Sequence, residues 1–130
     1  MFPEILNHVK EIMITNVATT TPDQTLAEAA RLMEERNIGS LAVLEKDRLV
    51  GIITERDFLK LAAKGYDSRT TKVSEGMTKP VVKCDPMTTI TEAFVLMKKY
   101  RVRHLPVVEK ERLVGMISLS DLVSAGRLLL

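Results

Sequence analysis

Residues 101–121, RVRHLPVVEKERLVGMISLSD, decide the fold of this chain. They read as a basic turn, an apolar strand, a charged hairpin turn, a second strand and a polar helix start. A second copy stands 64 positions earlier, at residues 37–57, NIGSLAVLEKDRLVGIITERD. Both copies contain Leu-x-Val-x-Glu-Lys-x-Arg-Leu-Val-Gly-x-Ile and end on an aspartate at the same offset. The same hairpin and helix start are therefore expected twice.

The repetition extends well beyond these two stretches. Residues 9–58, laid on residues 73–122 without a gap, agree at 20 of 50 positions, which indicates a duplicated unit. One unit of roughly 60 residues buries little surface, so two copies are expected to share a core. We predict an α/β (α+β) fold of tandem β-α-β-β-α repeats packed sheet to sheet with pseudo-twofold symmetry. Ligand clefts are expected where two such halves meet.

The first part of each repeat predicts a strand followed by an amphipathic helix. Residues 17–20 and 81–84 are short β-like runs, each followed by a proline-containing turn. The capping-box pattern Thr-x-x-Glu follows at 25–28 and 89–92. Apolar residues then recur at helical spacing and predict one buried face in each helix. They are Leu26, Ala29, Ala30 and Met33 in the first repeat, and Ile90, Ala93, Phe94 and Met97 in the second.

The remaining segments complete the predicted domain organisation. Residues 3–12 show helical spacing after a proline suited to a first turn. A helix that opens at 54–57 is expected to run to about Lys64, with Gly65 just past its end. The predicted divisions are an N-terminal helix (1–12), a first repeat (13–65), a connector (66–72) and a second repeat (73–130).

Composition excludes several classes of function. The chain has 130 residues, 45% of them apolar and 28% charged, which is an ordinary globular balance. A net charge of +2 and few aromatic residues do not favour nucleic acid as a partner. The apolar runs are too short for membrane insertion, and the N-terminus lacks the features of a secretion signal. The single cysteine, Cys84, forms no internal disulfide, which fits a cytoplasmic location.

At this point the repeats resemble CBS domains, the family named after cystathionine β-synthase, and the pair resembles a Bateman module. The resemblance rests on Gly51-Ile-Ile-Thr-Glu-Arg-Asp57 and Gly115-Met-Ile-Ser-Leu-Ser-Asp121, and Arg103-His-Leu-Pro-Val107 is similar to the family's strand-start motif. It covers residues 9–125. It implies an energy-sensing regulatory module that needs no cofactor but binds AMP, ADP or ATP, or else S-adenosylmethionine. It also implies a regulated enzyme or transporter as a partner in trans.

The resemblance further implies which residues hold the ligand. The hydroxyl and carboxylate of each Gly-x-x-[Thr/Ser]-x-x-Asp motif would hold the ribose, with Thr54 and Asp57 in one cleft and Ser118 and Asp121 in the other. The phosphate in the Asp57 cleft would face Arg103 and His104. The adenine would be enclosed by Val81, Val82 and Lys83 in the Asp57 cleft, and by Ala18, Thr19 and Thr20 in the Asp121 cleft.

Elementary chemistry agrees with these roles. A carboxylate at a helix start can accept two bonds from a diol, and the helix N-terminus favours an anion. Arginine offers phosphate a planar pair of donors. The first repeat has Gly39-Ser40 where the second has Arg103-His104. We therefore predict two unequal sites, with AMP or ADP held more tightly on the Asp57 side.

Simpler interpretations stand beside these roles. Thr54 with Asp57, and Ser118 with Asp121, also form good helix N-caps, and capping can coexist with ligand binding. Arg103 and His104 could form a solvated turn. Gly51 and Gly115 could allow close packing or a bulge.

No sequence pattern points to an enzyme or a metal site. Cys84 has no obvious base partner, and the familiar catalytic and metal-ligand motifs are missing from the sequence. No catalytic residue is therefore assigned. The alternative function is a non-catalytic dimerisation or interaction scaffold with vestigial pockets. The apolar tail 128–130 favours this alternative, and a homodimer is expected under either function.

Overall fold

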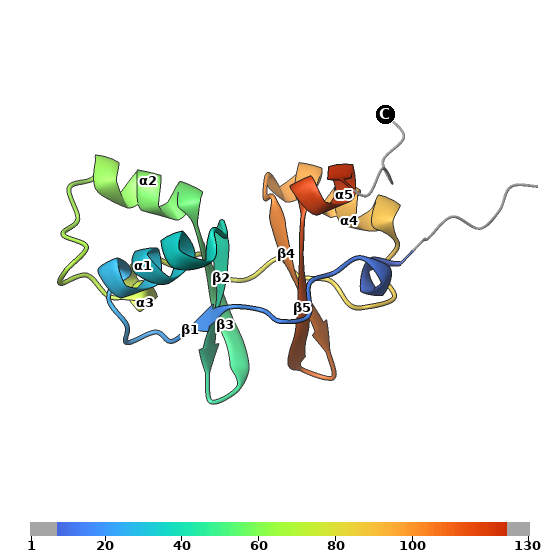
Figure 1. Cartoon of the computed structure of the whole chain (residues 1–130), viewed down its shortest axis with the longest axis horizontal. Helices are drawn as coiled ribbons and strands as arrows, with labels where there is room; N and C mark the ends of the chain where they lie inside the picture. The colour runs from blue at the N-terminus through green and yellow to red at the C-terminus, as the bar shows by residue number, and fades with distance from the viewer. Residues whose placement is uncertain (1–7, 125–130) are drawn as a thin grey trace, which may run out of the picture. The chain divides into compact units, whose positions relative to one another are not determined.

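The structure is a computed structural model of the chain and describes residues 8–124. Figure 1 labels the elements of both repeats and colours them by their order in the chain. They form two compact units that do not follow the order of the chain. Unit 2 is the continuous segment Ala18–Val81. Unit 1 combines Met1–Val17 with Val82–Leu130, so it is built from two segments far apart in the sequence.

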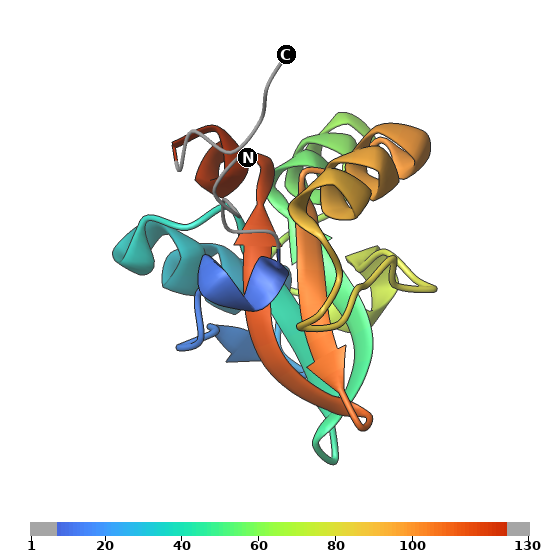
Figure 2. The ribbon, with the colours of Figure 1, turned by 90° about the vertical axis from the view of Figure 1, so that its right-hand side faces the viewer.

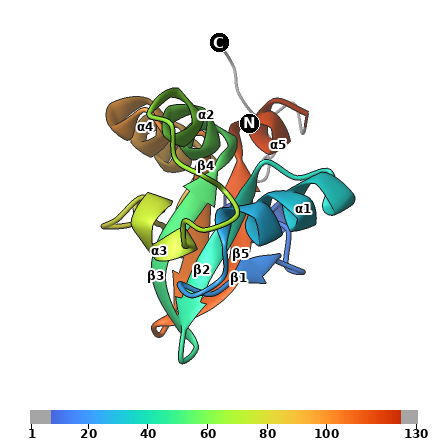
Figure 3. The same ribbon diagram turned by 90° about the vertical axis from the view of Figure 1, so that its left-hand side faces the viewer.

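Unit 2 is a three-stranded sheet covered by helices on one face (Figure 3). Its strands are β1 (Thr19–Thr20), β2 (Ser40–Glu45) and β3 (Arg48–Thr54), in the order β1-β2-β3. Its helices are α1 (Leu26–Arg36), α2 (Glu55–Ala63) and α3 (Val73–Gly76). Strand β1 runs parallel to β2, and β2 runs antiparallel to β3.

The core of unit 2 comes from one face of α1 and from the sheet. Leu26, Ala29 and Met33 of α1 are buried, as their spacing predicts, and they pack in one cluster with Leu41 and Ile53. Burying side chains of this size is the main favourable contribution to folding. One predicted core position is wrong, because Ala30 is only half-buried and lines a hollow of the surface.

Unit 1 repeats this arrangement with a two-stranded sheet. Its elements are a 3-10 helix (Val9–Glu11), α4 (Ile90–Tyr100), β4 (His104–Glu109), β5 (Arg112–Ser118) and α5 (Leu119–Ser124). Figure 2 shows the 3-10 helix, in blue, on the same side of the strands as α4 and α5. Ile90, Ala93 and Met97 of α4 are buried as predicted. Phe94 is half-buried and packs against the edge of this core.

Residues 9–14 and the matching residues 73–78 each lie directly before one repeat in the chain. Each of these two segments packs on the other repeat. Val9 is fully buried in unit 1, and Ile14 pairs with Met116 of β5 through two backbone hydrogen bonds of 2.9 Å. In unit 2 the counterpart Thr78 pairs with Ile52 in the same way, at 2.8 and 3.1 Å. Each repeat's core is therefore completed by the short segment that precedes the other repeat.

The hairpins and the end of α2 agree with the sequence prediction, while the shortest strands do not. Both hairpins turn at the predicted charged residues, and Gly65 has a φ of +81° after the end of α2. The predicted strand 17–20 is shorter, because only Thr19–Thr20 is a strand. The predicted strand 81–84 is wrong, since only Cys84 makes a bridge, to Val107. Residues 3–7 of the predicted helix 3–12, and the tail 128–130, lie outside the described residues.

Candidate functional site

The carboxylate of Asp57 is held at the start of α2 by three hydrogen bonds. Its Oδ2 accepts from the backbone N–H and the hydroxyl of Thr54, at 2.9 and 3.2 Å. Its Oδ1 accepts from the hydroxyl of Thr78 at 2.8 Å. Asp57 is only 7% exposed, so both oxygens are fixed in a largely water-free setting. Such a carboxylate keeps acceptor capacity on Oδ1, because an ionised carboxyl group offers about four acceptor sites.

Local sequence explains this geometry. Thr54 ends β3 in an extended conformation and its hydroxyl accepts from the N–H of Asp57, so the pair forms the predicted capping box. Thr78 is brought to the same place by its backbone pairing with Ile52. Sequence reasoning missed Thr78. A signal existed, since Thr78 stands where the first repeat has Ile14, so only one copy carries a hydroxyl there.

The corresponding group in unit 1 is Asp121, and it is held by fewer partners. The backbone N–H of Ser118 donates to its Oδ2 at 3.1 Å, and the N–H of Asp121 donates to the Ser118 hydroxyl at 3.0 Å. The residue that matches Thr78 is Ile14, whose side chain has no donor. Asp121 is half-buried. The two motif aspartates therefore differ in burial and in hydrogen bonding.

Arg103 and His104 lie at the start of β4, at the same end of unit 1 as Ser118. His104 pairs with Ser118 across the hairpin, and the carbonyl of Arg103 accepts from the N–H of Leu119 at 2.8 Å. The Arg103 side chain is exposed and His104 is half-buried. Unit 1 thus brings together both predicted phosphate-binding residues and one predicted ribose-binding pair. Their role toward Asp57, a residue of unit 2, stays a prediction.

A hollow of about 400 Å³ lies beside β1 in unit 2. It is lined by Thr19, Thr20, Thr21, Gln24, Leu44, Lys46 and Asp47. Two of the adenine contacts predicted for the Asp121 cleft, Thr19 and Thr20, border it. The hydroxyl of Thr20 is buried and has no hydrogen-bond partner among the described residues. A molecule in this hollow would therefore meet Thr20 through other atoms than its hydroxyl oxygen.

The other predicted adenine contacts lie beside the sheets. Ala18 precedes β1, and its carbonyl accepts from the N–H of Ala42 at 3.3 Å. Val81 and Val82 are half-buried and Lys83 is exposed. They lead to Cys84, which matches Thr20 and is buried. Burial and the neighbouring Asp85 raise the pKa of the Cys84 thiol to about 11, so the reactive thiolate is scarce at neutral pH.

Residues 8–124 contain neither a metal-binding cluster nor a membrane-spanning helix. No group of three or more His, Cys, Asp or Glu side chains there could hold a metal ion. Over the same residues, no helix has the length and apolar character needed to cross a membrane.

A duplicated α+β unit, in which a motif aspartate caps one helix of each copy, places the chain in a class of tandem-repeat α+β proteins. The CBS domain model matches residues 9–64 and again 72–127, which together are most of the chain. The chain therefore belongs to the CBS domain family and carries two CBS domains. Pairs of these domains are regulatory modules that typically bind adenosine-containing ligands.

Similar proteins include both small and long chains. The CBS domain-containing protein YhcV of Bacillus subtilis is 41% identical over 118 residues, which are 90% of this chain and 84% of YhcV. An inosine-5'-monophosphate dehydrogenase of Methanocaldococcus jannaschii is 42% identical over 87% of this chain, but the match spans only 22% of that protein. The solved structure of a hexameric CBS-CP12 protein from bloom-forming cyanobacteria superimposes with a TM-score of 0.87 at 35% identity. It covers 96% of this chain and 75% of that one.

Proposed function

We propose that this chain is a non-catalytic, energy-sensing module that binds an adenine nucleotide of the AMP, ADP or ATP type. S-adenosylmethionine is a second candidate ligand. The observation that carries the proposal is the Asp57 carboxylate, which is buried, fixed by three donors and still able to accept a bond on Oδ1. A ribose hydroxyl could donate a hydrogen bond to this oxygen.

The proposed site has a defined set of residues for each part of the nucleotide. Thr54 and Asp57 hold the ribose, Arg103 and His104 face the phosphate, and 81–83 enclose the adenine. A second, weaker site uses Ser118 and Asp121 for the ribose and 18–20 for the adenine. The stronger hydrogen bonding of Asp57 supports unequal sites, because a prearranged acceptor loses less freedom when a ligand binds.

The nucleotide state would be passed to another protein. We propose a cytoplasmic enzyme or transporter as this partner in trans. The similarity to a segment of a much longer dehydrogenase supports a link to an enzyme, since the matching segment there is part of an enzyme chain.

Thermal unfolding with a ligand panel tests the proposal. AMP, ADP, ATP and S-adenosylmethionine are compared with GMP and GTP. A ligand at 100 times its Kd should stabilise the folded chain by about 2.7 kcal/mol. The absence of any shift with all four adenosine compounds would overturn nucleotide binding.

Titration calorimetry of variants then separates the two sites. Asp57→Asn should weaken the tightest binding more than Asp121→Asn does. Glu28→Gln is the matched control, because Glu28 caps α1 in the same way without belonging to the proposed site. Equal losses in Asp57→Asn and Asp121→Asn would contradict unequal sites.

The alternative scaffold function is favoured by one observation. Leu59 of α2 and Val123 of α5 occupy matching positions in the two repeats and are 71% and 58% exposed. Exposed apolar side chains on matching helices are suited to docking another protein surface. A chain that binds no nucleotide but still associates through these helices would have this function.

A further inference from the structure

In unit 2 the side chain of Met77 fills the space beside a glycine of β3. A Cβ placed on Gly51 would lie 2.5 Å from the Met77 sulfur and 2.9 Å from its Cγ. The thioether therefore occupies the room that a side chain at position 51 would need. Met77 also packs against the buried cluster that contains Ile53 and Val73. This thioether is thus one of the contacts that hold residues 73–78 on β3.

The backbone attachment of this segment to β3 is short. Thr78 pairs with Ile52 through two hydrogen bonds of 2.8 and 3.1 Å, which form an isolated bridge. The hydroxyl of Thr78 donates to Asp57 Oδ1 at 2.8 Å. Met77 stands directly before Thr78 in the chain, so the packing of its side chain helps to place the donor that fixes one oxygen of the buried Asp57 carboxylate.

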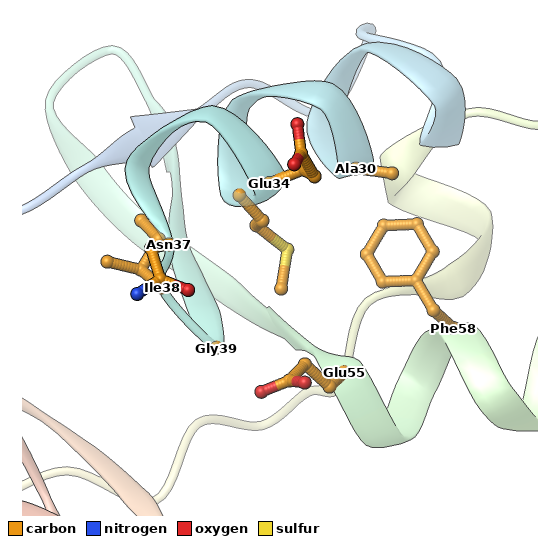
Figure 4. Close-up of a pocket in the computed structure, with 8 residues that line it drawn as sticks. Ala30, Glu34, Asn37, Ile38, Gly39, Glu55 and Phe58 are labelled. Atoms are coloured by element: carbon orange, nitrogen blue, oxygen red, sulfur yellow. The ribbon is translucent and has the colours of Figure 1, made fainter.

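Within residues 8–124 the methionines differ in their access to a small oxidant. Met77 and its counterpart Met13 are half-buried, while Met87 is 54% exposed. Three others are buried, at 8% exposure or less: Met33, Met97 and Met116. Met33 is among them although it lines the hollow between α1 and α2 (Figure 4). Met77 and Met13 therefore combine partial access from solvent with a packing role.

We propose that Met77 is a modification site for peroxide, and that its sulfoxide releases residues 77–78 from β3 and withdraws the Thr78 hydroxyl from Asp57. In the reaction, a lone pair of the thioether sulfur attacks one oxygen of hydrogen peroxide. The S–O bond forms as the O–O bond breaks, and the sulfur loses two electrons. The second oxygen leaves as water and carries both protons. The proposal does not depend on nucleotide binding.

The sulfoxide is poorly suited to the place of the thioether. Oxidation converts an apolar side chain into a polar one, and a polar group buried without a hydrogen-bond partner is costly. On the side of Gly51 the sulfur already fills the space. Water can solvate the sulfoxide once residues 77–78 move away from β3. This movement breaks few backbone contacts to the strand, because the bridge between Thr78 and Ile52 is isolated.

The matching contact in unit 1 has a different consequence. Met13 lies against Gly115 as Met77 lies against Gly51. Its sulfoxide should loosen the bridge between Ile14 and Met116. The side chain of Ile14 has no donor, so this loosening removes no hydrogen bond of the kind that Thr78 makes. Oxidation of Met77, and not that of Met13, therefore reaches the carboxylate of a motif aspartate.

Hydrogen peroxide applied to the full-length chain tests the proposal. Peptide mass spectrometry locates each sulfoxide, and hydrogen exchange followed by NMR reports on the amides of Ile52 and Thr78. We expect a sulfoxide at Met87 first and at Met77 next, and about tenfold faster hydrogen exchange of both amides in the oxidised chain. Methionine sulfoxide reductases for both epimers should restore slow hydrogen exchange, whereas their reductant alone should not.

Leucine variants assign the effect to one methionine. Met77→Leu keeps an apolar side chain of similar volume that peroxide does not oxidise. Its amides at Ile52 and Thr78 should exchange at the same rate before and after treatment. Met13→Leu is the matched control, and in this variant peroxide should still accelerate both amides. Met87→Leu should respond to peroxide as the natural chain does.

Three outcomes would overturn the proposal. In the first, Met77 stays unmodified when Met87 is fully oxidised. In the second, the Met77 sulfoxide forms but the amides of Ile52 and Thr78 exchange no faster. In the third, Met77→Leu shows the same acceleration as the natural chain. If Met77→Leu folds poorly, the recovery of the natural chain with the reductases decides, since a change that they do not reverse is not caused by a sulfoxide.

Discussion

At the scale of single residues, one hydroxyl group distinguishes the two motif aspartates. Thr78 donates to Asp57 Oδ1, while the matching residue for Asp121 is Ile14. A buried carboxylate is costly unless its oxygens are hydrogen-bonded. Asp57 is more deeply buried than Asp121, and it is also the one with the additional donor. Burial and hydrogen bonding have therefore diverged together between the repeats.

This difference predicts the effect of Thr78→Val. The substitution keeps the shape of the side chain but removes the donor to Asp57 Oδ1. We expect the free energy of unfolding to fall by about 1–3 kcal/mol, because the substitution leaves Oδ1 of the buried Asp57 carboxylate without this donor. Urea unfolding measures the change.

Thr70→Val is the control for this experiment. Thr70 is exposed, and its hydroxyl donates only a long 3.5 Å bond to the carbonyl of Asp67. The urea midpoint of the Thr70→Val variant should equal that of the natural chain. A Thr78→Val midpoint equal to that of the natural chain would mean that the bond to Asp57 contributes nothing to stability.

Sequence could predict part of this site. The pairs Thr54 with Asp57 and Ser118 with Asp121 were accessible, because a capping box is a pattern within four residues. Thr78 was not, because it lies 21 positions from Asp57 and reaches it only through the pairing of Thr78 with Ile52. A contact of that kind depends on the fold of the whole unit.

At the scale of elements, α1 and α4 both begin with a capping box. Thr25 and Glu28 cap α1, and Thr89 and Glu92 cap α4, with each carboxylate accepting from the threonine N–H at 2.9 and 2.8 Å. This hydrogen bond, supported by the threonine hydroxyl, holds the pKa of Glu28 and of Glu92 below the ordinary value of 4.5. The ionised carboxylates therefore stabilise the folded chain.

The lowered pKa values predict how stability depends on pH. The contribution is fully present above the unfolded value of 4.5 and is lost as the pH falls through the lower folded pKa. A Glu28→Gln, Glu92→Gln variant should unfold at lower urea than the natural chain at pH 7, and the difference between the two midpoints should be smaller at pH 3. Glu45→Gln, at the end of β2 instead of a helix start, should follow the natural chain at both pH values. A constant difference between pH 7 and pH 3 would contradict this.

The accuracy of sequence prediction also followed the range of the interactions in each element. The helices α1 and α4 were predictable, because their caps and apolar spacing are encoded within eleven-residue segments. The four-residue helix α3 and the single bridge at Cys84 were not predicted correctly. Such short elements are stabilised by the sheet and core around them, so local sequence carries little signal.

At the scale of the molecule, the two repeats exchange short segments, because the segment directly before each repeat packs on the other one. The segment containing Val9 and Ile14 completes unit 1, although the chain next enters unit 2. Sequence comparison aligned this segment with 73–80 but could not show on which repeat either one packs. The two segments also make the same glycine contact. Met13 lies against Gly115, and Met77 lies against Gly51. Either methionine leaves no room for a Cβ at its glycine without moving.

The exchange predicts that deleting residues 1–16 damages the distant part of the chain and spares the adjacent part. The deletion removes Val9, which is fully buried in unit 1, and the two backbone bonds between Ile14 and Met116. Hydrogen exchange should therefore become fast in 104–118, while 26–54 keep their protection because unit 2 is a continuous segment. A chain that lacks only residues 1–7 keeps every one of these contacts and should exchange as the natural chain does. Loss of protection in 26–54, with 104–118 still protected, would mean that the segment belongs to the repeat that it precedes.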